Sequence, residues 1–350
     1  MSISNNLMLN KKIIDEYDKE KMYSIFDKWP EIAKKAFESN CIPINFDNIN
    51  HIVFAGMGGS GAIGDMFSSI LSKSKIHLNV VKGYSLPKTV DSKTLVIVVS
   101  VSGNTAETMS VLDGANKIGS KIIAFTSGGK MQEYCIENQI EYRIIEQLHS
   151  PRASFTLFLY TILKVLHLTL DIKKSDILES IKELDKTKKE ISSLNLTSQN
   201  PALNLAKWIK NIPVIYYPYG LESAAIRFKN SLQENAKSHA MTEDIIEICH
   251  NGVVSWERKS EIHPIIIEGK NDHVKTKERW KILKEYFNLN EINYWEISST
   301  EGSILTKLIN LIYLLDYSTI YKAVLTEIDP TPIEPIDFVK NKLNLNNNFS

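Results

Sequence analysis

Two short loops rich in glycine and hydroxyl side chains could hold a phosphate group. Residues 56–61 read G-M-G-G-S-G after an apolar run, and residues 100–105 read S-V-S-G-N-T after a second apolar run. Each loop precedes a stretch with helical periodicity, so each places backbone N–H groups at a helix N-terminus, where anions are attracted. No lysine follows the second loop as it would in a P-loop nucleotide site. Such a set of amides and hydroxyls suits the phosphomonoester of a small molecule.

The glycine spacing of the first loop also matches the dinucleotide-binding fingerprint, which would make the chain an NAD-dependent dehydrogenase. That fingerprint needs an acidic residue about 20 positions further on to hold a ribose hydroxyl. No Asp or Glu occurs between Asp65 and Asp91, so NAD binding is the weaker interpretation. Each loop taken alone could also be an ordinary turn. Two such loops on neighbouring strand–helix units favour a common site at the carboxyl ends of the strands.

The elements that position these loops alternate along the chain. Short apolar runs, rich in β-branched residues, predict strands at 51–55, 78–81, 94–99, 121–125, 213–217, 264–267 and 294–297. Helical stretches separate these runs, and strands joined by helices pair in parallel with both faces of the sheet covered. The fold class is therefore α/β, with two domains that each contain a mainly parallel sheet flanked by helices.

The domain boundaries follow from the charged helical segment at 172–194, which reads as a connection. Residues 1–155 are predicted to form the N-terminal domain with the two loops, and residues 1–48 are its helical lead-in. Residues 156–342 are predicted to form the second domain. The Asn-rich residues 343–350 are expected to be a frayed tail.

Composition excludes several classes of partner. The 350 residues include 41 Lys+Arg and 41 Asp+Glu with no basic stripe, so no nucleic-acid partner is expected. The three cysteines are scattered without a Cys-x-x-Cys pair, which argues against a disulfide framework or a zinc site. No signal-peptide apolar region is found, and the longest uncharged apolar stretch, 153–163, is shorter than the ~20 residues that span a membrane. We predict a cytoplasmic protein without a membrane partner.

Together with the two loops, three further motifs resemble the sugar isomerase (SIS) superfamily. They are P-R at 151–152, Q-E-N-A-K at 233–237 and H-N at 250–251. Within the superfamily the match is to the bifunctional phosphoglucose/phosphomannose isomerases, and it covers about residues 50 to 340. The resemblance implies two SIS-type domains and interconversion of glucose 6-phosphate and fructose 6-phosphate through a cis-enediol. It leaves open whether mannose 6-phosphate is also accepted.

The resemblance also assigns roles to individual residues. The substrate phosphate would be bound by residues of the two loops: Gly59, Ser60, Ser100, Ser102 and Thr105.

Four residues outside the loops would carry the reaction. Glu234 would be the base that moves a proton between C1 and C2, and Arg152 would lie against the enediolate oxygens. His250 would assist ring opening, reaching the active site from the partner subunit of a homodimer, and Lys340 would also serve ring opening. A base, a proton relay and a positive charge suffice for this isomerisation, so neither a metal nor a redox cofactor is expected.

Each of these residues has a simpler interpretation. Glu234 falls opposite the apolar stripe of the helix expected from about residue 221, where an isolated glutamate would be solvated. His250 alone could be structural, and Lys340 could lie on a solvated helix face. Gly252 stands where the resemblance leads us to expect an acidic residue after H-N, which puts the packing near His250 in question.

The alternative function is a non-catalytic sugar-phosphate-binding SIS module. Such a module would keep the two phosphate loops and lose the base. The presence of Glu234, His250 and Arg152 together argues against it.

Overall fold

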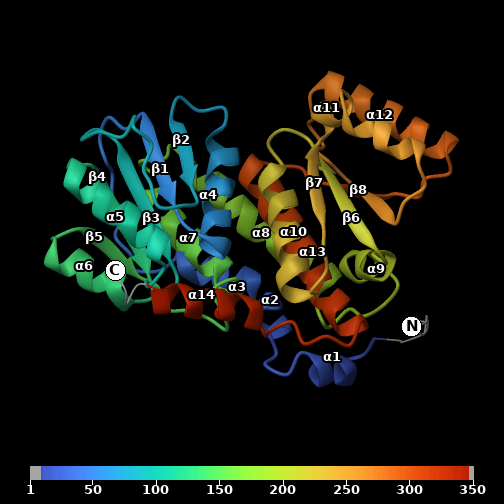
Figure 1. Cartoon of the computed structure of the whole chain (residues 1–350), viewed down its shortest axis with the longest axis horizontal. Coiled ribbons are helices and arrows are strands. Elements are labelled where there is room, and N and C mark those ends of the chain that lie inside the picture. Colours follow the sequence, from blue (N-terminus) through green and yellow to red (C-terminus); the bar gives the residue numbers. More distant parts are fainter. Residues whose placement is uncertain (1–8, 347–350) are drawn as a thin grey trace.

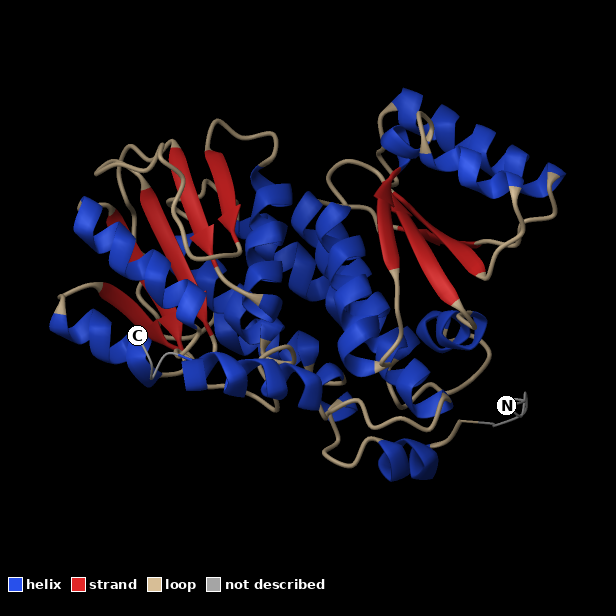
Figure 2. Ribbon diagram, in the orientation of Figure 1, coloured by secondary structure: helices blue, strands red, loops and turns tan. Residues whose placement is uncertain are grey.

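The computed structural model describes residues 9–346, and two parallel sheets organise them (Figure 1; Figure 2). The first sheet has the order β2-β1-β3-β4-β5, and all its neighbouring strands pair in parallel. Its strands are β1 (His51–Ala55), β2 (His77–Val81), β3 (Leu95–Ser100), β4 (Lys121–Thr126) and β5 (Glu141–Ile144).

Helices cover both faces of the first sheet. On one face lie α5 (Ala106–Ile118) and α6 (Gly129–Glu137), whose apolar side chains share a cluster with those of β1, β3 and β4. The other face packs on α3 (Trp29–Phe37), α4 (Gly58–Leu71) and α7 (Phe155–Leu166). This double cover explains why all six residues of β3 are apolar or small and buried.

The second sheet has the order β7-β6-β8-β9 and is also parallel throughout. Its strands are β6 (Ile212–Tyr217), β7 (Met241–Asp244), β8 (Ile262–Glu268) and β9 (Trp295–Ser298). One face packs on α11 (Ile245–Ile248), the 3₁₀ helix η1 (Gly252–Glu257) and α12 (Val274–Leu289). The other packs on α9 (Pro201–Trp208), α10 (Glu222–Asn235) and α13 (Ile304–Leu325).

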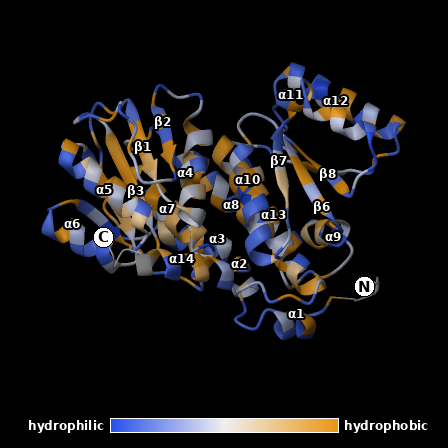
Figure 3. Cartoon of the chain, viewed as in Figure 1, coloured by the Kyte–Doolittle hydropathy of each residue, from blue (hydrophilic) through white to orange (hydrophobic). Residues whose placement is uncertain are grey.

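A layer of helices between the sheets forms the largest core. It contains α4, α7, α8 (Lys174–Ile191), α10 and α13, whose apolar side chains belong to one cluster, and Figure 3 shows apolar and polar residues mixed along these helices. By length and composition α13 could cross a membrane, but 89% of its most apolar window is buried inside the protein. Trp29 stacks on Tyr313 of α13 with ring centroids 4.9 Å apart. The lead-in helices α1 (Lys11–Tyr17) and α2 (Tyr23–Phe26) adjoin the same helix.

The structure confirms the predicted fold class, with two mainly parallel sheets flanked by helices. All seven predicted strands form within a few residues of their expected bounds, whereas β5 and β7 were not predicted. Both missed strands have four residues, lie at a sheet edge and contain charged side chains. They lack the apolar run that marks a buried strand.

The last element of the described residues is α14 (Glu334–Asn346), an exposed helix. The predicted tail begins inside this helix, since residues 343–346 are helical, and its remainder lies outside the described residues. The domain boundary predicted between residues 155 and 156 falls at the first residue of α7 and stays a prediction.

Candidate active site

The two glycine and hydroxyl loops lie side by side at the carboxyl ends of the strands of the first sheet. They follow β1 and β3, which are paired neighbours with Ala55 opposite Val98. α4 and α5 begin directly after these loops. Neither the N-cap residue Met57 nor the N-cap residue Thr105 makes a side-chain capping hydrogen bond. No side chain of an N-cap residue therefore occupies the first N–H groups of these helices, and a phosphate is a suitable partner for such groups.

Internal hydrogen bonds preform the second loop. The Ser100 and Thr105 hydroxyl oxygens are 3.0 Å apart, and the N–H of Gly103 donates to the Ser100 hydroxyl at 3.1 Å. Ser102 is exposed, and its hydroxyl accepts from the N–H of Asn104 at 3.3 Å. Gly103 has φ +67°, so this position favours glycine. The loop thus presents its hydroxyl groups in a fixed arrangement.

The first loop adjoins Arg152. Ser60 is buried at the start of α4. A Cβ atom added to Gly59 would lie 3.3 Å from the Cα of Arg152, so the two backbone segments are close together. The structure therefore places the residues predicted to bind phosphate and the predicted arginine on the same side of the first sheet, at the carboxyl ends of its strands.

Arg152 is buried, with 8% of its surface exposed, and is oriented by neutral acceptors. Its Nε donates to the side-chain oxygen of Asn235 at 2.8 Å. Its Nη2 donates to the carbonyls of Pro330 at 2.7 Å and Thr331 at 3.0 Å. The Nη1 atom takes part in none of the hydrogen bonds found within residues 9–346. Burial lowers the pKa of Arg152, and the nearby carboxylate of Glu234 opposes this shift.

Glu234 lies beside this arginine near the end of α10. Its Oε2 is 3.6 Å from Nε of Arg152, and 27% of its side chain is exposed. Lys237 follows, and its Nζ donates to the carbonyls of Glu234 at 2.6 Å and Pro332 at 2.7 Å. Burial lowers the pKa of Lys237, and the charge of Arg152 lowers it further. A carboxylate therefore lies among positive groups and remains open to solvent.

Within one chain, His250 and Glu234 lie at opposite ends of α10. β6 and β7 are parallel, so α10, which follows β6, and α11, which follows β7, both begin at the same edge of the second sheet. His250 comes just after α11 at that edge and is exposed. α10 runs back from it for 14 residues and carries Glu234 to its far end. Figure 1 shows α11 well separated from the part of the molecule where α14 lies.

Lys340 lies on α14 and is exposed. Within the described part of the chain it forms no hydrogen bond or ion pair with Glu234 or Arg152. Gly252 lies beside Glu243, whose Oε2 would be 3.0 Å from an added Cβ. A carboxylate is therefore close to Gly252, although it comes from β7 rather than from the position after Asn251.

The roles predicted from the sequence did not include Asn235, Lys237 or the carbonyls of Pro330 and Thr331. Asn235 and Lys237 lie inside the Q-E-N-A-K motif, so their proximity to Glu234 was a usable signal. The carbonyls at 330 and 331 carry no such signal because any residue type supplies a backbone oxygen. At the end of β2, where a dinucleotide site would place an acid, Lys82 pairs with Asp65 at 2.6 Å.

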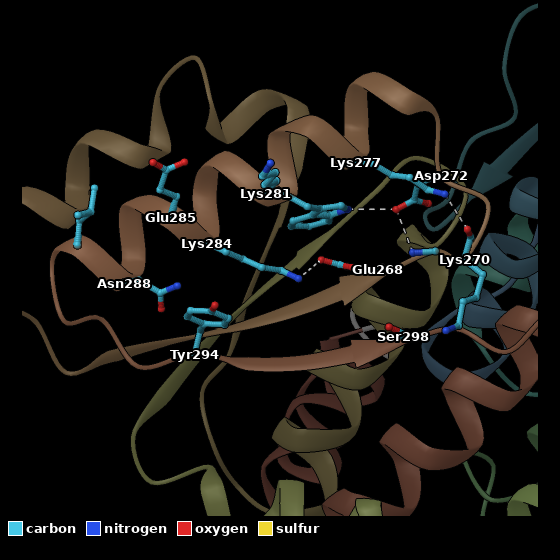
Figure 4. Close-up of a pocket in the computed structure, with 13 residues that line it drawn as sticks. Glu268, Lys270, Asp272, Lys277, Lys281, Lys284, Glu285, Asn288, Tyr294 and Ser298 are labelled. Carbon is cyan, nitrogen blue, oxygen red and sulfur yellow. Dashed lines mark hydrogen bonds and ion pairs between the residues drawn. The ribbon is translucent and has the colours of Figure 1, made fainter.

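A groove with a volume of about 840 Å³ lies elsewhere, between α12 and the strands β8 and β9 (Figure 4). None of the predicted site residues lines it. Among its charged side chains, Lys284 pairs with Glu268 at 2.5 Å, and Lys284 also pairs with Glu296 at 2.5 Å. Asp272 accepts from Trp280 at 3.1 Å. We therefore place the candidate active site at Arg152 and Glu234, where loops, base and cation converge, rather than in this groove.

Comparisons with known proteins match both halves of the chain. A family model described as SIS domain matches residues 46–166, and one described as bacterial phospho-glucose isomerase C-terminal SIS domain matches residues 198–343. The chain is 34% identical to a bifunctional phosphoglucose/phosphomannose isomerase from Caldicellulosiruptor bescii, covering 90% of this chain and 96% of the relative. It is 30% identical to the protein of the same name from Aquifex aeolicus, covering 93% and 96%.

Among solved structures, a hypothetical protein from Thermus thermophilus is similar, with a TM-score of 0.70 and 15% identity. The match covers 97% of this chain and 90% of that one, and it shows a shared fold. The two family models confirm that both halves of the chain are SIS-type domains.

Proposed function

Because the chain belongs to the bifunctional phosphoglucose/phosphomannose isomerases and is a sugar-phosphate isomerase, we propose that it interconverts glucose 6-phosphate and fructose 6-phosphate, and that it also accepts mannose 6-phosphate. The observation that carries this proposal is the pairing of Glu234 with Arg152, whose backbone adjoins Gly59 of the first glycine and hydroxyl loop. A base and a fixed positive charge within reach of one bound phosphate are what aldose–ketose isomerisation requires.

In this proposal the phosphate is bound by Gly59, Ser60, Ser100, Ser102 and Thr105. The carboxylate of Glu234 removes the proton from C2 of the open-chain aldose, and the electron pair moves to form a cis-enediol. The Nη1 donors of Arg152 point to the enediolate oxygens, because its Nε and Nη2 donors already have partners. A proton moves from the C2 hydroxyl to the former carbonyl oxygen on C1. The same carboxyl group then returns its proton to C1 as the C2 oxygen becomes the carbonyl, which yields the ketose.

Ring opening precedes proton transfer and needs a second acid–base group. We assign it to His250 of a second copy of the chain, because His250 lies at the opposite edge of its own second domain. Lys340 remains a candidate for the same step through movement of α14. The proposal therefore includes a homodimer that acts in the cytoplasm on glycolytic and gluconeogenic sugar phosphates.

The decisive experiment supplies purified, EDTA-treated protein with fructose 6-phosphate and follows aldose phosphates by NMR. Wild type is expected to form glucose 6-phosphate, and formation of mannose 6-phosphate as well would establish dual specificity. Glu234→Gln removes the base and is expected to lower kcat by ~10²–10⁴-fold. Glu222→Gln, an exposed glutamate at the other end of α10, is the matched control and should keep wild-type activity.

A non-catalytic binding module predicts a different result. Fructose 6-phosphate would then bind to wild type without turnover, and Glu234→Gln would leave binding unchanged. An activity abolished by EDTA and restored by a divalent ion would contradict the metal-independent mechanism.

A further inference from the structure

α10 presents three buried polar side chains, spaced by four residues, to α13. Arg227 bonds to Asp316 at 2.8 Å, and Ser231 donates to the other oxygen of Asp316 at 2.8 Å. Asn235 donates through its amide nitrogen to Thr319, also at 2.8 Å. We call these five residues the α10–α13 polar ladder. Such groups are costly to bury unless each has a partner, so their close pairing calls for a functional explanation.

The ladder contacts Arg152 at two points. Near one end, Nη2 of Arg227 donates to the backbone carbonyl of Arg152 at 3.1 Å. At the other end, the side-chain oxygen of Asn235 accepts from Nε of Arg152 at 2.8 Å. Both the main chain and the guanidinium group of Arg152 are therefore tied to the same pair of helices.

Thr319 fixes which way the amide of Asn235 faces. The single hydroxyl hydrogen of Thr319 goes to the carbonyl of Asp316, at 2.6 Å. Its oxygen can therefore only accept from Asn235, which must turn its NH₂ group toward Thr319. The carbonyl oxygen of Asn235 is then left to accept from Arg152.

Asn235 is a neutral acceptor, unlike a carboxylate. It can orient the guanidinium group without pairing with its charge, and the carbonyls of Pro330 and Thr331 do the same. The positive charge of Arg152 therefore remains available to Glu234 and to the substrate.

We propose that Thr319 and Asn235 are positioning residues that aim the free Nη1 donors of Arg152 at the reacting oxygens of the substrate. Thr319 acts two contacts away from the substrate, through Asn235 and Arg152. This inference rests on the proposed isomerase function.

The test compares two buried hydroxyls on α13. Ser318 and Thr319 both donate to a carbonyl of their own helix at 2.6 Å, but Thr319 also accepts from Asn235. Thr319→Val is expected to lower kcat for fructose 6-phosphate by about tenfold or more, since small misplacements of a catalytic group are costly. Ser318→Ala, the matched control, and Thr319→Ser, which restores the acceptor, should keep kcat close to wild type.

Two binding measurements separate positioning from general disruption. Competitive inhibition by inorganic phosphate probes the loops and should be unchanged in Thr319→Val. Binding of a five-carbon phosphorylated aldonate, whose carboxylate resembles the enediolate, should weaken about as much as kcat falls. Thr319→Ala provides the same test if the valine variant does not fold.

Wild-type kcat in both Thr319→Val and Thr319→Ala would overturn the positioning role and leave the isomerase proposal standing. An equal loss in Ser318→Ala would overturn it as well. If wild type itself does not convert fructose 6-phosphate, the proposed function fails and the positioning role fails with it.

Discussion

Arg152 is held by several acceptors that a lysine could not satisfy together. Its planar group reaches Asn235 through Nε and the carbonyls of Pro330 and Thr331 through Nη2, while Nη1 stays available. Arg152→Lys keeps the charge but carries its three N–H donors on a single nitrogen atom. We expect kcat to fall by ~10²–10³-fold, the loss typical of one transition-state donor, with a smaller change in KM.

Steady-state kinetics on purified Arg152→Lys check this prediction. Arg143→Lys is the control, because Arg143 lies on β5 and pairs with Glu141 away from the site. A variant at position 152 with wild-type kcat would remove the arginine from the mechanism.

Gly103, in the second glycine and hydroxyl loop, gives a further prediction at the scale of single residues. A Cβ atom there would lie 1.8 Å from the carbonyl oxygen of Gly128, and the positive φ disfavours any L side chain. Gly103→Ala should destabilise the protein by more than the ~1–2 kcal/mol of a left-handed backbone and raise KM for fructose 6-phosphate. Thermal unfolding and kinetics measure both effects. Gly83→Ala, where nothing lies within 4 Å of the added atom, should change neither.

At the scale of elements, α10 shows that helical periodicity does not predict every buried side chain. Its apolar stripe was evident in the sequence, and the opposite face therefore seemed solvated. Arg227, on that face, is buried instead, because α10 lies in the layer between two sheets. Periodicity finds one buried face of a helix, but it does not reveal a polar face buried against another helix.

Local features of the fold and the candidate site could be predicted from the sequence, whereas contacts between distant segments could not. The strands with apolar runs, the two loops and the Q-E-N-A-K motif were readable because their signals are local. The bonds from Arg152 to Asn235, 83 positions away, and to Pro330, 178 positions away, depend on packing between domains. Neither residue type nor spacing encodes such contacts.

Glu179 gives a pH-dependent prediction for the junction of two helices. Its carboxylate on α8 accepts from the N–H of Ser303 at 2.9 Å and the hydroxyl of Thr306 at 2.8 Å, at the start of α13. The bond from the Ser303 backbone is the main cause that lowers the pKa of Glu179. A lowered folded-state pKa stabilises the protein above the unfolded value of ~4.3, and this stabilisation is lost as pH falls through the folded pKa.

Glu179→Gln should therefore lower Tm at pH 7, and the difference from wild type should shrink as the pH falls below about 4. Thermal unfolding at several pH values measures this difference. Glu183→Gln is the control, because Glu183 pairs only locally with Lys186 on α8. A Tm difference at position 179 that does not vary with pH would show that the carboxylate charge is not responsible.

At the scale of the whole molecule, the candidate site belongs to neither domain alone. The loops and Arg152 come from the first sheet and its flanking segment, whereas Glu234 comes from a helix of the second. Residues 330 and 331, which precede α14, complete the orientation of Arg152. The shared helical layer therefore sets the geometry of the site, and changes that shift α10 against α13 should affect catalysis before they affect phosphate binding.

A second copy of the chain is needed if His250 is to act together with Glu234. The 14 residues of α10 span about 21 Å at 1.5 Å per residue, and His250 lies at the edge where α10 begins while Glu234 lies where it ends. If His250 acts across a two-fold dimer, each active site takes Glu234 from one chain and His250 from the other. Dimers that contain only Glu234→Gln or only His250→Gln should each have strongly reduced isomerase activity.

Co-expression of these two variants with different affinity tags provides the test. Random pairing makes about half of the dimers mixed, and each mixed dimer has one site with both native residues, so about a quarter of wild-type activity should return. Mixed dimers purified through both tags should show about half of wild-type activity, because one of their two sites is intact. Light scattering checks that dimers form. Mixed dimers that form and stay as inactive as the pure variants would mean that His250 does not serve the partner's Glu234.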